Sequence, residues 1–371
     1  MGKIYSDKSI ASDQMHAISQ LATSSMHRFA FATTLVASSV LAADDTLLAQ
    51  LTQWNKDFGP SYLPKGVDPT NTNDLLARLQ AGKTAIAAVA KTQPEATFAI
   101  GRFALHTPKE FRDYVLRSYT AGLLKMDAAE ASAVDRGVGA ANGTVDWSTT
   151  NCMGAVGDQG KCSSSWVFAT TAAVETAHCI VTGSPIDVSE QDIVSCDRDE
   201  LDEGCRGGIE YTAIDWITKT GICLAQDYPY ISGADGKNNA CQTSCRKQKL
   251  AIDGHAWASG EPKLETVVAK QPVASMVEAT NDIWQHYASG VITSCPGSPS
   301  DHSVLVVGYG TEGKTNYWKV RNSWGAKWGE MGYARVRRGA GGNGVCQIAE
   351  LPVYPKLTAA PTVAPTTKPA C

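Results

Sequence analysis

Eleven cysteines constrain this chain of 371 residues more than any other feature of its sequence. Cytosolic thiols are kept reduced, whereas secreted proteins use cysteines in such numbers to form disulfides. The cysteines are unevenly placed, because residues 43 to about 135 contain none and the first is Cys152. We therefore expect a cysteine-free N-terminal region and a disulfide-bonded domain, in a protein that enters an oxidising compartment.

A secretory signal peptide is expected in such a protein, and residues 26–42 have its features. A short basic start precedes an apolar run from Phe29 to Leu41, which ends in a small-residue cleavage pattern. The run is too short to span a bilayer. We predict that residues 1–25 are a leader outside the translated protein and that Met26 begins the signal peptide. The protein is then secreted or delivered to a lysosome-like compartment.

The charge balance argues against nucleic acids and membranes as partners. Lys and Arg total 33 against 37 for Asp and Glu, and no long run of one sign occurs. No later apolar segment is long enough to cross a bilayer. We expect neither a nucleic-acid partner nor a membrane partner.

The cysteine-free region, residues 43–140, is predicted to be helical. It is rich in Ala, Leu and Lys, with a helical period over residues 74–90. A second helix is predicted after Thr107, where Pro108 and Glu110 supply good helix-start chemistry. The region is therefore interpreted as a small helical unit.

The rest of the chain changes from helical to β-rich patterns. Residues 165–182 and 208–221 predict two helices, each stopped by a glycine. Beyond Val273, short β-rich runs alternate with Gly-containing turns and predict a twisted sheet or barrel. The fold class is therefore α+β. The tail at 356–371 alternates Thr, Ala and Pro, a composition that suits a disordered stalk open to O-glycosylation.

Three residues with complementary chemistry occur in a characteristic order. Ser165 lies at a predicted helix start in "DQGKCSSSW", His302 lies in "DHSVLVVGYG" and Asn322 in "RNSWG". A nucleophile near the mature N-terminus, with His and Asn about 130 to 150 residues downstream, is the arrangement of papain and cathepsin peptidases. The motifs "SEQDIVSC", "GCRGG" and "YPY" occur between them. The sequence thus resembles the papain and cathepsin L-like cysteine peptidase family over about residues 145–355.

The resemblance implies a domain organisation and a fold. Residues 141–355 are expected to form a papain-like two-lobed fold, with a helical left lobe and a β-barrel-like right lobe. Residues 43–140 resemble the family's inhibitory propeptide, although the match to its helical signature is weak. The implied activity is peptide-bond hydrolysis, and no cofactor is implied.

The resemblance also assigns roles around the catalytic centre. In this family a histidine returns its proton to the leaving amine, an asparagine orients the imidazole and a glutamine stabilises the oxyanion. His302, Asn322 and Gln159 fall on those positions, and Trp324 falls where a tryptophan shields the hydrogen bond between histidine and asparagine.

The nucleophile itself departs from the family pattern. The family's "C-G-S-C-W" is replaced by "C-S-S-S-W", so Ser165 takes the place of the cysteine and Ser163 that of a glycine. A helix N-terminus and an imidazolium hold a cysteine as thiolate, but they barely ionise a hydroxyl. Ser163 adds a side chain to the cleft wall. We therefore expect activity toward ordinary peptides to be reduced or lost.

Three classes of function stay open after this substitution. The first is a secreted hydrolase that acts on polypeptide substrates with altered chemistry. The second is an inactive homologue that binds peptides or absorbs cystatin-like inhibitors aimed at active relatives. The third, more remote, resembles silicateins, serine-bearing members of this family that condense silicic acid. The chain's own propeptide is an expected partner in each case.

Matching to the family also implies a substrate cleft. Gly207 and Gly208 are expected to pair with the substrate backbone, and Leu351 at the pocket base favours aliphatic or aromatic side chains. No His-His pair occurs between "GCRGG" and "YPY", so an open, endopeptidase-type cleft is expected. The pocket for the second residue before the scissile bond is implied to contain Ile209, Glu210, Met276, Ser300, Ser303 and Leu351.

Cysteine positions predict five disulfides. Family positions imply Cys162–Cys205, Cys196–Cys241 and Cys295–Cys346. We further propose Cys152–Cys179, because these residues flank and occupy the helix of the nucleophile motif, and Cys223–Cys245.

The remaining features of the sequence concern association of chains, modification and metals. Cys371 has no partner among the five predicted disulfides, so the protein is expected to be a monomer unless this residue links chains. Asn142 in "NGT" is a glycosylation acceptor. Cys241 and Cys245 with His255 nearby could suggest zinc, but no second compact ligand pair follows, and we expect no metal site.

Overall fold

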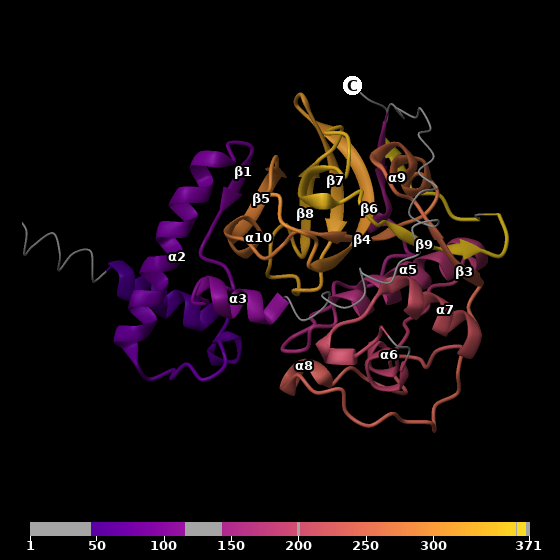
Figure 1. The fold of residues 1–371 in the computed structure, drawn as a ribbon, viewed down its shortest axis with the longest axis horizontal. Helices are drawn as coiled ribbons and strands as arrows, with labels where there is room; N and C mark the ends of the chain where they lie inside the picture. Colours follow the sequence, from indigo (N-terminus) through magenta and orange to yellow (C-terminus); the bar gives the residue numbers. More distant parts are fainter. Residues whose placement is uncertain (1–45, 116–142, 199–200, 361, 369–371) are drawn as a thin grey trace, which may run out of the picture.

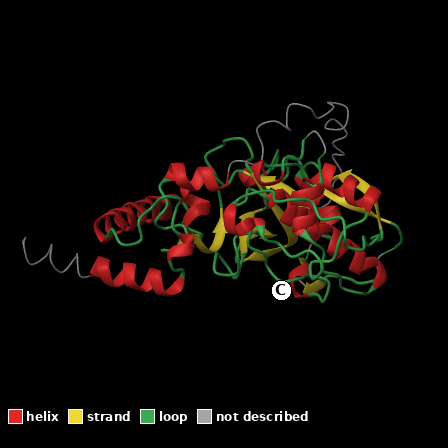
Figure 2. Ribbon diagram, turned by 90° about the horizontal axis from the view of Figure 1, so that it is seen from below, coloured by secondary structure: helices red, strands yellow, loops and turns green. Residues whose placement is uncertain are grey.

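The computed structural model of the protein describes residues 46–115, 143–198, 201–360 and 362–368. The predicted leader, signal peptide, glycosylation site Asn142 and Cys371 lie outside these residues. Residues 46–115, here called the N-terminal segment, lie to one side of the main domain, residues 143–357 (Figure 1). Figure 2 shows this arrangement from below. In the described part of the chain, no helix is long and apolar enough to cross a membrane.

The N-terminal segment is mainly helical, as predicted. Its last helix, α3 (Pro108–Val115), starts with the expected reciprocal cap, in which Glu110 N–H donates to Thr107 Oγ1 at 3.2 Å and Thr107 N–H donates to Glu110 Oε2 at 2.8 Å. A small core of its own surrounds Trp54 and Leu79. Its elements are a helix over 46–57, η1 (Pro60–Tyr62), α2 (Thr72–Thr92), β1 (Ala96–Phe98) and α3 (Pro108–Val115).

The helical lobe of the main domain is built around one buried helix, α5. Glycines in the left-handed region end α5 and α7, with φ of 75° at Gly183 and 74° at Gly221. Both ends fall where the sequence predicts them. The elements of this lobe are η3 (Trp147–Thr149), α5 (Ser165–Thr182), α6 (Glu190–Cys196), η4 (Gly204–Arg206), α7 (Glu210–Thr220) and α8 (Ser232–Asp235).

The second lobe is a sheet with the strand order β1-β5-β8-β7-β6-β4-β9-β3. The turn of the β6–β7 hairpin contains Gly313, whereas Gly308 and Gly310 lie within β6 and pair with β7. Its elements are β2 (Thr144–Asp146), β3 (Ile252–Trp257), α9 (Glu261–Val268), β4 (Val273–Val277), α10 (Asp282–His286), β5 (Tyr287–Ile292), β6 (His302–Glu312), β7 (Thr315–Arg321), β8 (Tyr333–Arg337), η5 (Val345–Gln347), β9 (Val353–Leu357) and β10 (Thr366–Lys368).

Five disulfides tie the main domain, and they are the five pairs expected from the sequence. Four lie in the helical lobe and the connections around it, and one joins the loop after β5 to η5. They are Cys152–Cys179, Cys162–Cys205, Cys196–Cys241, Cys223–Cys245 and Cys295–Cys346.

Two parts of the chain differ from the sequence-based expectation. The N-terminal segment contributes a strand, because β1 pairs antiparallel with β5 of the main domain. The prediction that the whole tail is disordered is wrong for residues 362–368, since β10 pairs antiparallel with β2. In both cases a strand of three residues is stabilised by pairing with a strand far away in the sequence.

Candidate active site

Ser165 is the first residue of α5. The turn before it is held by the Cys162–Cys205 disulfide and by Ser163 N–H, which donates to the Cys205 carbonyl oxygen at 3.3 Å. The Ser165 side chain is fully buried, and its Oγ accepts a hydrogen bond from the backbone N–H of Ser303 at 3.3 Å. The start of α5 therefore lies against the first residues of β6.

His302 and Asn322 meet at the ends of two neighbouring antiparallel strands, β6 and β7. His302 Nε2 lies 2.8 Å from Asn322 Oδ1, and the N–H of Ser323 donates to the same oxygen at 2.7 Å. Because an amide oxygen only accepts hydrogen bonds, Nε2 carries the proton and Nδ1 is left as an acceptor. The Trp324 ring lies against the imidazole, with 4.6 Å between the ring centroids.

The protonation state of His302 follows from its burial. Burial lowers the pKa of His302 to about 4, and the hydrogen bond that Nε2 donates to Asn322 opposes this shift. Among the described residues, Nδ1 has no hydrogen-bond partner. A neutral imidazole can act as a general base toward a hydroxyl, but it lacks the positive charge that stabilises a thiolate.

Gln159 is held in one orientation near the start of α5. Its Nε2 donates to the Cys162 carbonyl oxygen at 3.1 Å, and its Oε1 accepts from Ser323 Oγ at 2.7 Å. Its backbone N–H donates to the Ser323 carbonyl oxygen at 2.8 Å. The side-chain amide is thus pre-oriented, which is what an oxyanion-stabilising donor requires.

The predicted substrate residues are only partly brought together. Ile209 and Met276 form a buried apolar cluster, against which Leu351, Leu201 and Tyr211 pack. The structure adds Leu201 and Tyr211 to this cluster, which matching to the family did not name. In the sequence, only their apolar character and their position near Ile209 could have indicated these two residues.

The polar members of the predicted pocket have separate contacts. Ser300 Oγ donates to Glu350 Oε2 at 2.9 Å, next to Leu351. Glu210 is buried at the first position of α7. Ser303 contacts Ser165 through its backbone, as described above.

The two predicted backbone-binding glycines lie in a segment that requires glycine. Gly207 has a φ of 117°, in the region that other residues rarely adopt. A Cβ on Gly208 would lie 2.5 Å from the Trp166 ring and 2.7 Å from Asp202 Oδ1. Asp202 Oδ1 also accepts the Ile209 N–H at 2.9 Å. The segment is therefore closely fitted to the residues beneath it.

The N-terminal segment covers the catalytic centre. Phe103 and Phe111 pack on Trp324 with ring centroids 5.2 and 5.6 Å away. Ser163 Oγ donates to the carbonyl oxygen of Tyr114 at 3.4 Å. Arg102 forms an ion pair with Asp158 of the main domain. Neither Arg102 nor Asp158 is expected from the sequence to lie at the site, because nothing local to either residue indicates a contact between them.

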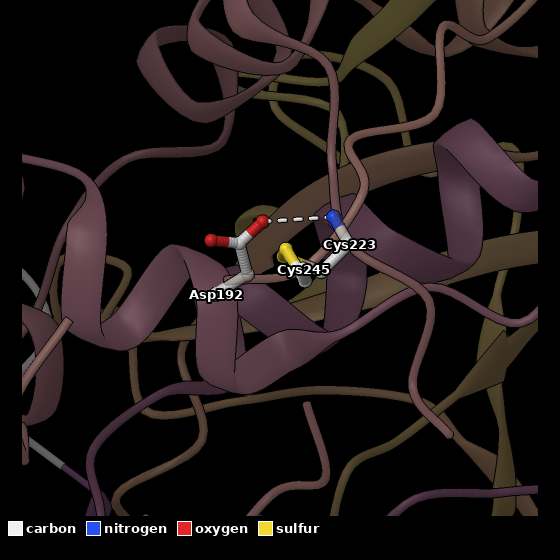
Figure 3. A group of neighbouring side chains, drawn as sticks. All are labelled: Asp192, Cys223 and Cys245. Carbon is white, nitrogen blue, oxygen red and sulfur yellow. Dashed lines mark hydrogen bonds between the residues drawn. A yellow bond between two sulfur atoms is a disulfide. The ribbon is translucent and has the colours of Figure 1, made fainter. Parts of the chain in front are cut away.

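One other group of side chains has the composition of a metal site. Ligand atoms of Asp192, Cys223 and Cys245 lie within 4.8 Å of one another (Figure 3). The two sulfurs are joined in a disulfide, so neither is a thiolate ligand. Asp192 accepts the Cys223 N–H at 2.9 Å and the Lys247 ammonium at 2.7 Å. The carboxylate therefore serves to hold the loop that carries the disulfide.

Comparisons with known proteins agree with this geometry. The model of the "Papain family cysteine protease" family matches residues 141–356, and the chain belongs to this family. Germination-specific cysteine protease 1 of Arabidopsis thaliana is 40% identical over 273 residues, which cover 70% of this chain and 71% of that protein. Cysteine proteinase COT44 of Brassica napus is 39% identical over 272 residues, with 70% and 81% covered.

Solved proforms show the same fold with an N-terminal segment. The proform of the ragweed pollen allergen Amb a 11 cysteine protease matches with a TM-score of 0.74 and 30% identity over 85% of this chain and 96% of that chain. Digestive procathepsin L 3 of Tenebrio molitor larval midgut matches with a TM-score of 0.69 and 31% identity over 84% and 99%. The main domain thus has the two-lobed papain fold, and the chain has the arrangement of a proform.

Proposed function

We propose that the protein is a secreted papain-like peptidase homologue whose N-terminal segment inhibits it and whose Ser165 stands at the nucleophile position. Its reaction is peptide-bond hydrolysis in an endopeptidase-type cleft, far slower than that of a cysteine enzyme. The burial of Ser165 against β6, beside the His302–Asn322 pair, is the observation that carries this proposal. Family membership supports the reaction class. Secretion rests on the signal peptide predicted at 26–42.

The low rate follows from the chemistry of the hydroxyl. A helix N-terminus and an imidazolium lower the pKa of a thiol into a useful range, whereas an alcohol stays protonated. His302 must then remove the proton as a neutral base, and its Nδ1 has no hydrogen bond to Ser165 among the described residues. Oγ also sits closer to its own Cβ than a sulfur would, and a misplacement approaching 1 Å costs about 100-fold in rate.

The substrate preference follows from the apolar cluster of Ile209, Met276 and Leu351. We propose that this cluster forms the pocket for the second residue before the scissile bond. Leu or Phe at that position would bury its side chain against three apolar residues, with a gain of about 1.5 to 3 kcal/mol relative to an exposed side chain.

A second candidate function is that of a pseudopeptidase, which binds peptides or inhibitors without turnover. This candidate is favoured because Ser165 Oγ accepts a hydrogen bond from the Ser303 N–H and makes none with His302 Nδ1. This candidate predicts measurable peptide binding by the processed protein and no product.

The test compares the processed protein with its Ser165→Cys variant, using reporters with Leu or Phe at the second position. We expect the variant to be at least about 100-fold faster, because the histidine, asparagine and glutamine are already positioned for a thiolate. Adding Ser163→Gly should raise the rate further by clearing the cleft wall. Thiol-directed peptide epoxides should label the variant and not the wild type.

His302→Ala serves as the control for each form. If wild type cleaves the reporters as fast as Ser165→Cys, and loses this rate with His302→Ala, the serine is a competent nucleophile and the proposed low activity is wrong. If Ser165→Cys also shows no turnover but binds the reporters, the pseudopeptidase is supported.

A further inference from the structure

Arg102 of the N-terminal segment is inserted into a polar site of the main domain. Its Nη1 lies 2.8 Å from Asp158 Oδ2 and its Nη2 lies 3.3 Å from Asp158 Oδ1. Nη1 also donates to the Trp324 carbonyl oxygen. Only 4% of the Arg102 side chain is exposed. A guanidinium that uses two nitrogens on one carboxylate and a third contact on a carbonyl is recognised by shape as well as by charge.

Arg102 Nη2 also donates to the Tyr114 hydroxyl of its own segment at 3.3 Å, but Asp158 and the Trp324 carbonyl belong to the main domain and are held in place by it. The N–H of Gly160 donates to Asp158 Oδ1 at 3.0 Å, which fixes the carboxylate. Asp158 and Trp324 face each other in an antiparallel β-bridge. Gly325 has a φ of 72°, and a Cβ there would lie 2.9 Å from Asp158 Oδ2. The space for the guanidinium is therefore maintained by a glycine and does not depend on the N-terminal segment.

The site of Asp158 and the Trp324 carbonyl adjoins the catalytic centre next to Gln159 and His302. Asp158 directly precedes Gln159, and Trp324 packs on His302. The apolar cluster proposed for the second residue before the scissile bond, Ile209 with Met276, shares no residue with this site. A peptide bound across Ser165 with one end at the apolar cluster would extend its leaving-group side toward Asp158.

We propose that Asp158, the Trp324 carbonyl and the space beside Gly325 form a guanidinium-binding subsite for an arginine on the leaving-group side of a bound peptide. The subsite becomes free when the N-terminal segment is removed, and Arg102 occupies it before that. The inference rests on the proposed function, because it takes the cleft to bind peptides across Ser165. Lysine fits less well, since an ammonium cannot span both carboxylate oxygens and the carbonyl.

The affinity of a substrate arginine should be lower than that of Arg102. The Arg102 guanidinium also lies over the rings of Tyr62 and Phe103, at 4.6 and 4.9 Å from their centroids. Both rings leave with the N-terminal segment. The contacts with Asp158 and the Trp324 carbonyl remain, and they are the contacts that favour arginine over lysine.

The test measures peptide binding without turnover. The full chain carrying Ser165→Ala is processed, and peptides with Leu at the second position before the scissile bond are titrated into it. Arginine and its uncharged isostere citrulline are compared at each of the first three leaving-group positions. We expect the arginine peptide to bind roughly 10- to 100-fold more tightly at one of these positions. Asp158→Asn should reduce this ratio to about 1, and Asp253→Asn, on an exposed face of β3, should leave it unchanged.

A second measurement uses the unprocessed full chain. Arg102→Ala empties the subsite, and agmatine, which carries a guanidinium, should then raise the melting temperature in a dose-dependent way. The same addition should have no effect when Asp158→Asn is also present. A ratio near 1 at all three positions, a ratio that survives Asp158→Asn, or no effect of agmatine on Arg102→Ala would overturn the subsite. Loss of reporter turnover by the wild type bears only on the proposed function, because neither measurement depends on catalysis.

Discussion

The main domain and the N-terminal segment are held together by different kinds of bonds. The main domain contains five disulfides, whereas the N-terminal segment has no cysteine. The segment has only a small core of its own, and Phe103 and Phe111 join the core of the main domain instead. The main domain is therefore cross-linked covalently, whereas the N-terminal segment packs on it without a disulfide.

The contacts between the two parts are all reversible. Strand β1 pairs with β5, and the N–H of Val291 donates to the Glu95 carbonyl oxygen at 2.7 Å. The Gln93 side chain accepts from Thr293 N–H at 2.9 Å and donates to Ser294 Oγ at 2.8 Å. Release of the segment therefore breaks hydrogen bonds, the Arg102–Asp158 ion pair and aromatic packing. The turn before Ser165 stays tied to Cys205 through Cys162.

The largest effect should come from the disulfide next to the catalytic centre. Replacing Cys162 and Cys205 with Ala opens a loop of 43 residues and should lower the free energy of unfolding by about 4 kcal/mol. The matched control is the pair Cys223 and Cys245, whose separation of 22 predicts about 3 kcal/mol. Urea unfolding of the full chain measures both. If both double variants lost a negligible free energy of unfolding, the disulfides would not be what makes the main domain more stable than the N-terminal segment.

The next effect concerns the aromatic anchor of the N-terminal segment. Phe103 is 1% exposed and packs on Trp324 and Phe111. Phe103→Ala should weaken attachment of the segment by about 3 kcal/mol, and Phe103→Leu should recover part of this by restoring apolar volume. Hydrogen exchange of the Val291 amide, which is bonded to the segment, measures the opening. Unchanged exchange in Phe103→Ala would mean that other contacts hold the segment.

For each pH unit by which the pH falls, acid should weaken the same attachment by less than Phe103→Ala does. Burial lowers the pKa of His106 and of His286 to about 4. Glu110 raises the pKa of His106, and Arg102 and Arg78 lower it. If release of the segment restores pKa values near 6.5, the released state binds more protons at any pH between about 6.5 and 4. Attachment is then strongest above that range and weakens as the pH falls, by up to about 1.4 kcal/mol per pH unit for each histidine.

The pH dependence is measured by the same hydrogen exchange between pH 7.5 and 4.5. His106→Gln should flatten the profile, and His255→Gln, in β3, should leave it unchanged. A profile that is already flat in the wild type would contradict a role for these buried histidines.

Much of the main domain could be predicted because its signals are local. The ends of α5 and α7 are set by Gly183 and Gly221, which take up left-handed conformations that favour glycine. The site residues His302 and Asn322 lie within motifs that the family shares, and the strand pairing of β6 with β7 brings them within hydrogen-bonding distance. For these two residues, the sequence motifs and the strand pairing predict the same site.

The contacts that hold the N-terminal segment could not be predicted, because each joins residues far apart in the sequence. Strand β1 has three residues, and its pairing with β5 depends on the position of the main domain. The ion pair of Arg102 with Asp158 joins a residue of the segment to one of the main domain, and nothing local in either residue marks it. Such contacts are set by tertiary structure, which overrides the weak preferences of short strands.

The tail shows the same limit, and its removal should have the smallest effect. Thr362 donates to the Ile180 carbonyl oxygen from its N–H at 2.7 Å and from its Oγ1 at 2.8 Å, which satisfies a carbonyl at the C-terminal end of α5. Truncation after Thr358 removes this contact and the β10–β2 pairing, and should cost about 1 kcal/mol. Thr362→Ala, which keeps the backbone contacts, should cost less. Thermal melting of both variants measures the difference. If the truncated chain has the same melting temperature as the wild type, the tail adds no stability and the prediction of a disordered tail is restored. The contrast between local and long-range contacts would then rest on the N-terminal segment.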